Sequence, residues 1–461
     1  MDVPQIGPAD VQELRGRVAG PVLTPHDDGY DRETAAYNLA TPIRPDVVVG
    51  ATGAEDVAAA VAWAAAHHVP VGVQATGHGA DYPMEGGLLI STTRLQDCEV
   101  DPHARTARVG AGVRWRSVLE AAVPHGLMGL SGSTTDVGVV GYTLGGGLPV
   151  LGRTYGFAAD HVHSLDVVTP DGRQRTVDAE HEPELFGLLR GGKGNLGVVT
   201  AMVFGLVPLE GFHGGGIFYP GEDAREVLGT WARWSRGLPE TVSTSIALLR
   251  LPDLDIVPEP LRDRFVVHLR YACTAGGEEC EQVLAPLRAV SRPVMDTIGP
   301  MSGRDIDAIH MDPPVPLPFR DSGRLLDDLD DAAIDALLGE AGPGTDCPLA
   351  LVEIRRLGGA LARTPGGGAD LVAGRDGEYL LNCVGLAVPP FGERVPGAIE
   401  ALLGALREHS SGRTLVNFQG GAGEGRDSTQ AWTAEGRARL VAAKAALDPE
   451  GLLRFQHTVH A

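Results

Sequence analysis

The stretch "PDVVVGATGAEDVAAAVAWAAAHHVPVGVQ", residues 45–74, decides the fold class. It begins with a β-branched run that is typical of a buried strand. Thr52 and Glu55 follow in capping-box spacing, and an alanine-rich segment then repeats its apolar residues with a period near 3.6. A second β-branched run ends at Gln74 and completes a strand–helix–strand unit. This pattern predicts an α/β arrangement, in which ligands bind where strands end in loops.

The segments that follow extend this arrangement. Residues 87–92, 107–113 and 164–179 alternate like strands, and the last of these contains a Pro-Asp-Gly turn. Residues 114–127 have helical spacing, with a stop expected at Gly126. The first part of the chain is therefore predicted to be α/β.

After about residue 208 the pattern changes. Residues 242–251 and 264–274 predict long antiparallel strands, and residues 276–290 predict a surface helix. The acidic stretch 320–342 has apolar residues at helical spacing with aspartates between them, which predicts a helix with a solvated face. These elements indicate a second domain of sheet and helices.

Size and charge narrow the class of protein. A chain of 461 residues can bury one large core or two to three domain-sized cores, and its net charge of -22 disfavours nucleic acid and anionic membranes. Without a signal peptide pattern or a long apolar run, we expect a cytoplasmic protein. Its five cysteines are few, odd in number and without C-x-x-C spacing, so we expect mostly buried thiols.

Two glycine motifs remain to be explained. Gly192, Gly194 and Gly197 spell G-x-G-x-x-G, but a helical segment precedes them and a β-branched run follows, which is the reverse of a dinucleotide-binding fingerprint. The run Gly145–Gly147 suits neither a helix nor a strand interior, since each glycine costs about 1 kcal/mol in a helix. Close approach to an extended ligand explains both motifs, and glycines needed only for turns are the alternative.

The two histidines of "DHVHS", His161 and His163, are the only candidates for a metal site in this region. Their spacing on a strand defines one face only weakly, so we expect hydrogen-bonded structural histidines and no metal. The sequence also lacks G-x-S-x-G and H-E-x-x-H motifs.

Five segments, taken in order, resemble the FAD-linked oxidases of the vanillyl-alcohol-oxidase superfamily, which have a PCMH-type FAD domain. They resemble the berberine-bridge-enzyme-like branch in particular. The segments are "PVGVQATGHG", "DVGVVGYTLGGGLPVLGRTYGFAADHV", "LLRGGKGNLGVVTAMVF", "LVNFQGGAGEGRD" and "AALDPEGLLRFQHTV". Each motif alone is weak, but their order and spacing are specific, and the resemblance extends from about residue 40 to the end.

The resemblance implies an α+β fold of two domains. An FAD-binding domain of two α/β subdomains is expected over residues 1–208, with its core at 40–208. A substrate domain, whose antiparallel sheet covers the flavin, is expected over residues 209–405. Residues 406–461 are expected to return to the FAD domain.

The resemblance also implies that His78 bonds covalently to the flavin 8α-methyl group. A neutral imidazole is a good nucleophile, and the link raises the flavin potential and prevents loss of the cofactor. Other cofactor contacts are implied at Gln74, Ala75, Thr76, Gly77, Gly79, Thr134, Thr135, Gly138, Gly141, Tyr142, Gly194, Asn195, Gly197, Val199 and Asn417.

Three departures from the family pattern affect the cofactor site. Many relatives have an arginine at the position of Gln74 and a serine at that of Gly79, so we expect phosphate contacts here to depend more on backbone dipoles. A second flavin-linking cysteine, common in relatives, has no counterpart among Ser133, Thr134 and Thr135. His78 is therefore expected to be the single covalent link.

Glu353 and Tyr142 are the candidate catalytic residues. Glu353 matches a carboxylate that relatives direct from the substrate-domain sheet toward the flavin, and burial would raise its pKa toward the working range. The alternative is a glutamate on an exposed strand face paired with Arg355, which alternation places on the same face. Tyr142 occupies the position of a histidine near flavin N1 in many relatives, where a hydrogen-bonding role and simple packing are equally open.

The expected activity is oxidation of a secondary metabolite, such as an alcohol, a phenol or a polyketide-type intermediate. Hydride would pass to flavin N5, and molecular oxygen would reoxidise the flavin. Sugar-oxidising relatives use a tyrosine-x-asparagine motif, but Leu415 replaces the tyrosine here while Asn417 is retained, which disfavours a carbohydrate oxidase. A flavin-dependent oxygenase, a dehydrogenase and a binding module without chemistry remain alternatives.

Overall fold

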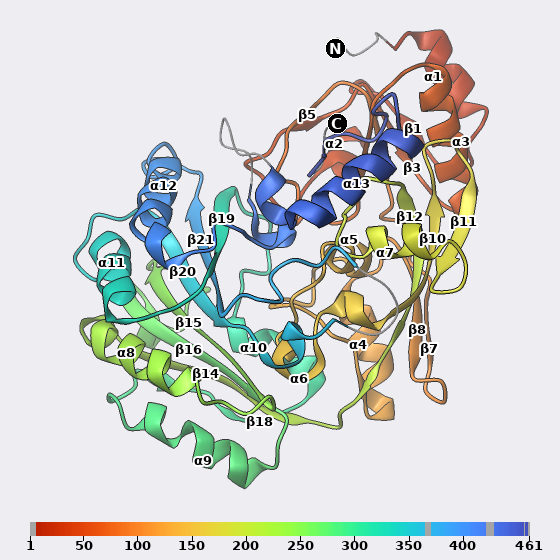
Figure 1. Cartoon of the computed structure of the whole chain (residues 1–461). Coiled ribbons are helices and arrows are strands. Elements are labelled where there is room, and N and C mark those ends of the chain that lie inside the picture. The colour runs from red at the N-terminus through yellow and green to blue at the C-terminus, as the bar shows by residue number, and fades with distance from the viewer. Residues whose placement is uncertain (1–5, 365–369, 421–427, 456, 460–461) are drawn as a thin grey trace.

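The computed structural model describes residues 6–364, 370–420, 428–455 and 457–459. Part of the predicted closing motif, residues 421–427, lies outside these ranges. The first sheet has the order β1 (Val22–Leu23), β3 (Val47–Gly50), β6 (Leu88–Ser91) and β4 (Val71–Gln74). Strands β3, β6 and β4 are parallel, and α3 (Ala54–Ala66) connects β3 to β4 (Figure 1). The predicted strand–helix–strand unit is therefore confirmed.

The start of α3 differs from the prediction. The residue before the helix is Gly53, and no side chain caps it. Asp56, within the first turn, instead accepts hydrogen bonds from the Thr52 backbone N–H at 2.8 Å and from its hydroxyl at 2.7 Å. The capping box of Thr52 and Glu55 is thus wrong, because the acceptor lies one residue later in the helix.

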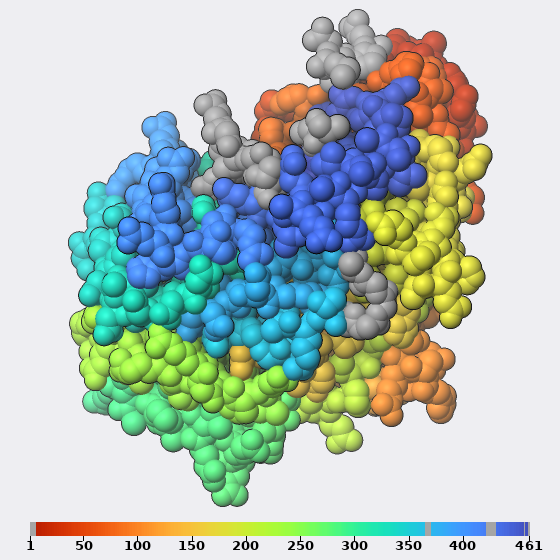
Figure 2. Space-filling model, in the orientation of Figure 1, coloured from red at the N-terminus to blue at the C-terminus, as the bar shows by residue number. Residues whose placement is uncertain are grey.

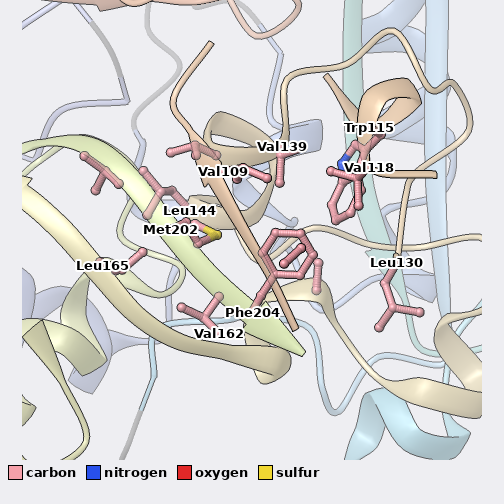
Figure 3. Close-up of a cluster of buried hydrophobic side chains, with 14 of the residues drawn as sticks. Val109, Trp115, Val118, Leu130, Val139, Leu144, Val162, Leu165, Met202 and Phe204 are labelled. Carbon is pink, nitrogen blue, oxygen red and sulfur yellow. The ribbon is translucent and has the colours of Figure 1, made fainter. Parts of the chain in front are cut away.

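The second sheet is antiparallel and supports the largest core of the N-terminal part. Its order is β11 (Gln174–Asp178), β10 (Val162–Val168), β12 (Val198–Gly205), β8 (Thr106–Gly110) and β7 (Cys98–Asp101). The helix α4 (Trp115–Ala122) covers it, and the Trp115 and Phe204 rings pack edge to face with centroids 5.5 Å apart (Figure 3).

The third sheet belongs to the part of the chain that is predicted to form the substrate domain. Its order is β17 (Met295–Asp296), β14 (Phe212–Pro220), β16 (Arg264–Cys273), β15 (Val242–Leu251), β20 (Leu349–Arg356), β21 (Tyr379–Leu386) and β19 (Phe319–Leu326), and β18 (Gly299–Met301) also pairs with β14. One face packs against α8 (Ala224–Ser235), α9 (Gly277–Arg288), α11 (Asp331–Ala341) and α12 (Val395–Ala405) (Figure 1). The other face carries the polar residues discussed below.

The acidic stretch 320–342 is only partly helical. Residues Phe319–Leu326 form β19, which pairs with β21 along its whole length, and only Asp331–Ala341 form the helix α11. The helical spacing over the first part was misleading because a sheet partner, β21, satisfies its backbone. Among the described residues, no helix is long and apolar enough to cross a membrane.

The C-terminal segment packs on the N-terminal sheets (Figures 1 and 2). Its helix α13 (Ala434–Leu447) ends before the Asp448-Pro449 pair, where the sequence predicts that it stops. The buried Lys444 Nζ donates to Asp448 Oδ2 at 2.9 Å, to the Asn195 carbonyl at 3.1 Å and to the Leu453 carbonyl at 3.0 Å. Leu453 in turn forms a parallel bridge with Val71 at the start of β4.

Two of the five cysteines are not thiols. Cys273 at the end of β16 and Cys280 in the first turns of α9 form a disulfide, with Cα atoms 5.8 Å apart. Cys383 is buried, while Cys98 and Cys347 are half-buried. The prediction of mostly buried thiols is thus wrong for this pair, because only the strand-to-helix turn brings the two sulfur atoms together.

Candidate active site

The loop after β4 is held against an N-terminal segment by backbone hydrogen bonds. Tyr37 N–H donates to the Thr76 carbonyl at 3.1 Å, and Asn38 N–H donates to the Gly77 carbonyl at 3.3 Å. Gly77 has a φ of +69°, and a Cβ there would lie 2.5 Å from the Ala36 Cα. Only glycine allows both the left-handed backbone and this close approach.

His78 is fixed with one ring nitrogen unused. Its ring stacks on Tyr37 with centroids 3.8 Å apart, and Nδ1 lies 3.0 Å from the Thr76 hydroxyl. Nε2 is buried and has no hydrogen-bond partner in the described part of the chain. Burial, with a smaller effect of Arg114, lowers the pKa of His78 to about 4, so the imidazole is neutral near neutral pH.

Three predicted glycines near this loop each have room for a Cβ, and Gly141 borders open space. A Cβ on Gly141 would meet nothing within 4 Å, and one on Gly138 would meet only Thr76 and Ala75, at 3.5 Å or more. A Cβ on Gly79 would meet only Lys193 Nζ, at 3.8 Å. Backbone that borders open space next to an unsatisfied imidazole suits a flat, extended ligand such as FAD.

Gln74 does not point its amide at this space. Its Nε2 donates to the Ala35 carbonyl at 3.0 Å and more weakly to the Thr34 carbonyl at 3.4 Å. The side chain therefore anchors the segment that carries Tyr37. This geometry agrees with the expectation that the loop itself offers no cationic side chain where many relatives have an arginine.

The two predicted threonines have different partners, and only Thr135 joins the N-terminal part to the part with the third sheet. Thr135 is buried, and its backbone N–H and hydroxyl donate to the Asp307 carboxylate at 2.7 and 2.6 Å. Asp307 begins α10 (Asp307–His310) in the substrate domain. The Thr134 hydroxyl accepts from Asp136 N–H at 3.3 Å. Both side chains are thus engaged by protein groups.

The residues of the G-x-G-x-x-G motif, Gly192 to Gly197, and the adjacent Val199 mostly contact other parts of the fold. Asn195 is buried and bonds to the carbonyls of Gly192 and His457 and to the N–H of Val459. A Cβ on Gly197 would lie 2.5 Å from Val167 Cγ2, and Val199 pairs with Val167 in the sheet. Gly194 is half-buried. Asn195, Gly197 and Val199 therefore hold the fold together, and their predicted cofactor contacts gain no support from this geometry.

The glycines of the run Gly145–Gly147 lie close to other residues of the chain. Gly146 and Gly147 have positive φ values of +95° and +68°. A Cβ on Gly145 would lie 2.0 Å from Asn417 Oδ1, and one on Gly147 would lie 2.6 Å from the Tyr142 ring. Close approach does require these glycines, but their neighbours are Asn417 and Tyr142 rather than an external ligand.

Sequence reasoning missed Lys193. It adopts a left-handed φ of +57°, which is unusual for a lysine, and its ammonium donates to the Gly141 carbonyl at 3.3 Å. The side chain is half-buried in a recess that lowers its pKa to about 8, with Asp81 opposing the shift. The rarity of lysine could have drawn attention to this residue, since Lys193 and Lys444 are the only lysines in the sequence.

Tyr142 and Asn417 lie together next to these glycines. Asn417 Nδ2 donates to the Tyr142 carbonyl at 2.8 Å, which joins the C-terminal segment to α5 (Val139–Leu144). The Tyr142 ring packs against the edge of Trp115, yet its hydroxyl is buried without a partner in the described structure. Burial raises the pKa of Tyr142 well above its usual value, against a weaker effect of Arg355, so the phenol stays neutral.

Glu353 is buried on the polar face of the third sheet. Its carboxylate accepts from the Ser245 hydroxyl at 2.6 Å, from Arg270 Nη1 at 2.6 Å and from Arg355 Nε at 2.9 Å. His310 Nε2 lies 3.4 Å away. The predicted pairing with Arg355 is present, but the face is not exposed.

The predicted direction of the pKa shift of Glu353 is wrong. Burial by itself would raise this pKa, but Arg355 and Arg270 together hold it well below its usual value. Glu353 is therefore an ionised acceptor whose oxygens are already engaged. Such a group is a weak base, and a role for it in positioning the arginines fits the contacts better.

These contacts predict that Glu353→Gln destabilises the protein. The substitution would leave two buried guanidinium groups without a counterion, so we expect the free energy of unfolding to fall by about 3 kcal/mol. Denaturant unfolding followed by circular dichroism would measure this, with Glu378→Gln on the protein surface as the control. An unchanged midpoint would contradict the proposed ionisation.

The loss of unfolding free energy caused by Glu353→Gln should depend on pH. Because the folded-state pKa of Glu353 is depressed, its stabilisation is complete above the unfolded value of 4.5 and is lost as pH falls through the folded-state pKa. The difference between the wild-type protein and Glu353→Gln is therefore expected to be largest near neutral pH and to shrink in acid.

Comparison with known proteins finds an FAD-binding domain in the N-terminal part of the chain. Residues 45–178 match the family described as "FAD binding domain". An uncharacterised FAD-linked oxidoreductase of Bacillus subtilis, YgaK, is 28% identical over 237 residues, which cover 50% of this chain and 52% of the relative. The chain thus spans about half the length of this curated relative.

The solved structures extend the likeness to the whole fold. The 6-hydroxy-D-nicotine oxidase of Arthrobacter nicotinovorans matches with a TM-score of 0.80 and 22% identity, over 95% of this chain and 97% of that chain. A berberine-bridge-enzyme-like protein of Physcomitrella patens matches with a TM-score of 0.83 and 18% identity, over 96% and 98%. The two solved structures confirm the predicted α+β fold. The family match confirms an FAD-binding domain within residues 45–178, and the curated relative is described as an FAD-linked oxidoreductase.

Proposed function

We propose that this chain is an FAD-dependent oxidase in which His78 is the single covalent link to the flavin. The supporting observation is the neutral imidazole of His78, whose buried Nε2 has no partner and whose Nδ1 already lies against Thr76. Nε2 is therefore the nitrogen expected to bond to the 8α-methyl carbon. Forming this N–C bond would remove one hydrogen from the methyl group and the N–H proton from the imidazole, and the two electrons released would reduce molecular oxygen to hydrogen peroxide.

The bound flavin would supply the redox chemistry, accepting a hydride from the substrate at N5 and passing electrons to molecular oxygen. Tyr142 contributes a neutral phenol, a hydrogen-bond donor whose hydroxyl has no protein partner in the described structure. The Asn417 amide fixes the backbone that carries this tyrosine. Glu353 as general base remains a prediction that its low pKa does not favour.

A secondary metabolite, such as an alcohol, a phenol or a polyketide-type intermediate, is the proposed substrate. At the position of the catalytic tyrosine in sugar-oxidising relatives, the buried Leu415 packs in an apolar cluster with Leu148 and Phe157 and has no hydroxyl to offer. This observation argues against a carbohydrate oxidase. The same scaffold could incorporate oxygen into the substrate, which makes an oxygenase the second candidate.

The covalent link can be tested by denaturing the purified protein. The wild-type chain is expected to keep its yellow colour and gain the mass of one FAD on a peptide containing His78, whereas His78→Ala should release its flavin. The exposed His125 provides a control, since His125→Ala should retain the link. Because the pKa of His78 is about 4, flavin incorporation should be equal at about pH 6 and about pH 8. Free flavin from denatured wild-type protein would refute the proposal.

Lys193 is proposed to neutralise the diphosphate of FAD. Its ammonium lies between Gly79 of the histidine loop and Gly141 of α5, and no arginine occupies the position of Gln74. The ammonium of Lys444, in contrast, already donates hydrogen bonds to one carboxylate and two carbonyls. Lys193 is thus the lysine whose charge remains available.

This role predicts weaker binding of FAD without the charge. In a His78→Ala background, where flavin is not covalently held, Lys193→Met is expected to raise the dissociation constant of FAD by about 10- to 100-fold. Lys193→Arg should keep most of the affinity. Lys193→Gly, which suits the positive φ, should lose it as Met does. Unchanged affinity in the Met and Gly variants would exclude a charge contribution.

The fate of oxygen separates the two candidate activities. An oxidase is expected to form one hydrogen peroxide per substrate oxidised and to leave isotopically labelled oxygen out of the product. Peroxide assays and mass spectrometry of the product under labelled oxygen measure the two quantities. Label in the product, with peroxide below one equivalent, would favour the oxygenase.

A further inference from the structure

The polar face of the third sheet contains an unbalanced positive charge. The single carboxylate of Glu353 contacts two guanidinium groups, Arg270 at 2.6 Å and Arg355 at 2.9 Å. The three side chains are only 1%, 3% and 12% exposed, respectively. Within the described ranges, neither arginine has another ion-pair partner. An excess cation shielded from water is unfavourable unless an anion accompanies it.

The unused hydrogen-bond donors belong to Arg355. Arg270 also donates to His268 Nδ1 at 3.3 Å and to the His310 carbonyl at 3.4 Å, so its nitrogens are engaged. Among the described residues, Arg355 donates a hydrogen bond only through Nε, to Glu353. Its guanidinium lies 5.2 Å from the centre of the Phe418 ring. Its two terminal nitrogens therefore form a free planar fork, the geometry that pairs with a carboxylate.

Arg355 is one of the residues that line a small cavity of about 30 Å³ between the third sheet and the N-terminal part of the chain. Arg270, His310 and Ser243–Ser245 line it from the side of the sheet, and Leu148–Val150 line it from the N-terminal part. No aspartate or glutamate is among its lining residues in the described structure. His310 is 94% buried, and its Nδ1 has no hydrogen-bond partner. The cavity thus has unsatisfied polar groups as well as excess charge.

A short chain of contacts connects the cavity to the proposed flavin site. Phe418, which stacks on Arg355, directly follows Asn417, and Asn417 binds the Tyr142 carbonyl. Arg355 is also close enough to influence the pKa of Tyr142. A molecule held by Arg355 would therefore lie near the residues that border the flavin.

We propose that this cavity binds a carboxylate of the substrate, with Arg355 as the specificity-determining residue. Glu353 is the positioning residue, since its contacts hold Arg355 in place. This inference rests on the proposed function and narrows the substrate class to molecules that bear an anionic group near the carbon to be oxidised.

Isothermal titration of the holoenzyme with acetate and with its neutral isostere acetamide would test this specificity, because the cavity is too small for an aromatic ring. We expect acetate to bind at least about tenfold more tightly than acetamide, and Arg355→Met to lose that preference by weakening the binding of acetate alone. Arg355→Lys should retain part of it. The substitution to methionine leaves Glu353 paired with Arg270, so the fold should be preserved.

Arg363→Met serves as the matched control, because Arg363 is an exposed arginine paired with Glu240 away from the cavity lining. It should leave the preference unchanged. Equal binding of the two probes by wild-type protein, or an intact preference in Arg355→Met, would overturn the proposal. The visible flavin spectrum of the same samples tests the proposed function separately, since a colourless protein would contradict that function and not the anion site.

Discussion

The buried ion pair between Lys444 and Asp448 holds together the segments on which the proposed cofactor site depends. Lys444 reaches the carbonyls of Asn195 and Leu453, and the Asp448 carboxylate accepts from the N–H groups of Leu452 and Leu453. This cluster thus joins Asn195 of the G-x-G-x-x-G motif, the C-terminal segment and the start of β4. Because every charge and donor in it is satisfied, it stabilises this arrangement despite burial.

From this anchor, β4 leads into a loop whose shape is set by backbone contacts rather than by side chains. The hydrogen bonds from Tyr37 and Asn38 place the loop, and the Gln74 amide secures the segment beneath it. Side chains then have two separate tasks. On the side of the FAD-binding domain, His78 and Lys193 are proposed to act as the nucleophile and the cation of the cofactor site. On the side of the third sheet, Arg270 and Arg355 form a buried charged cluster with Glu353.

Local sequence patterns were sufficient for much of this fold. The period near 3.6 in residues 54–66, the long apolar strands after residue 240 and the stop before Asp448 all match the observed elements. Patterns failed where a distant partner decided the outcome. Residues 319–326 are a strand because β21 pairs with them, and Cys273 and Cys280 are linked because a turn brings them together.

The sequence by itself predicted the FAD-binding fold and placed His78 in a glycine-rich loop, since the unusual backbone of such a loop must be encoded locally. Only the tertiary structure decided the charge states and the partners of the polar residues. Glu353 is ionised because Arg270 on β16 and Arg355 on β20 meet it across the sheet, and Thr135 is engaged because Asp307 reaches it from the other domain. Electrostatic interactions depend on distance in space and on burial, and neither can be read from the order of residues along the chain.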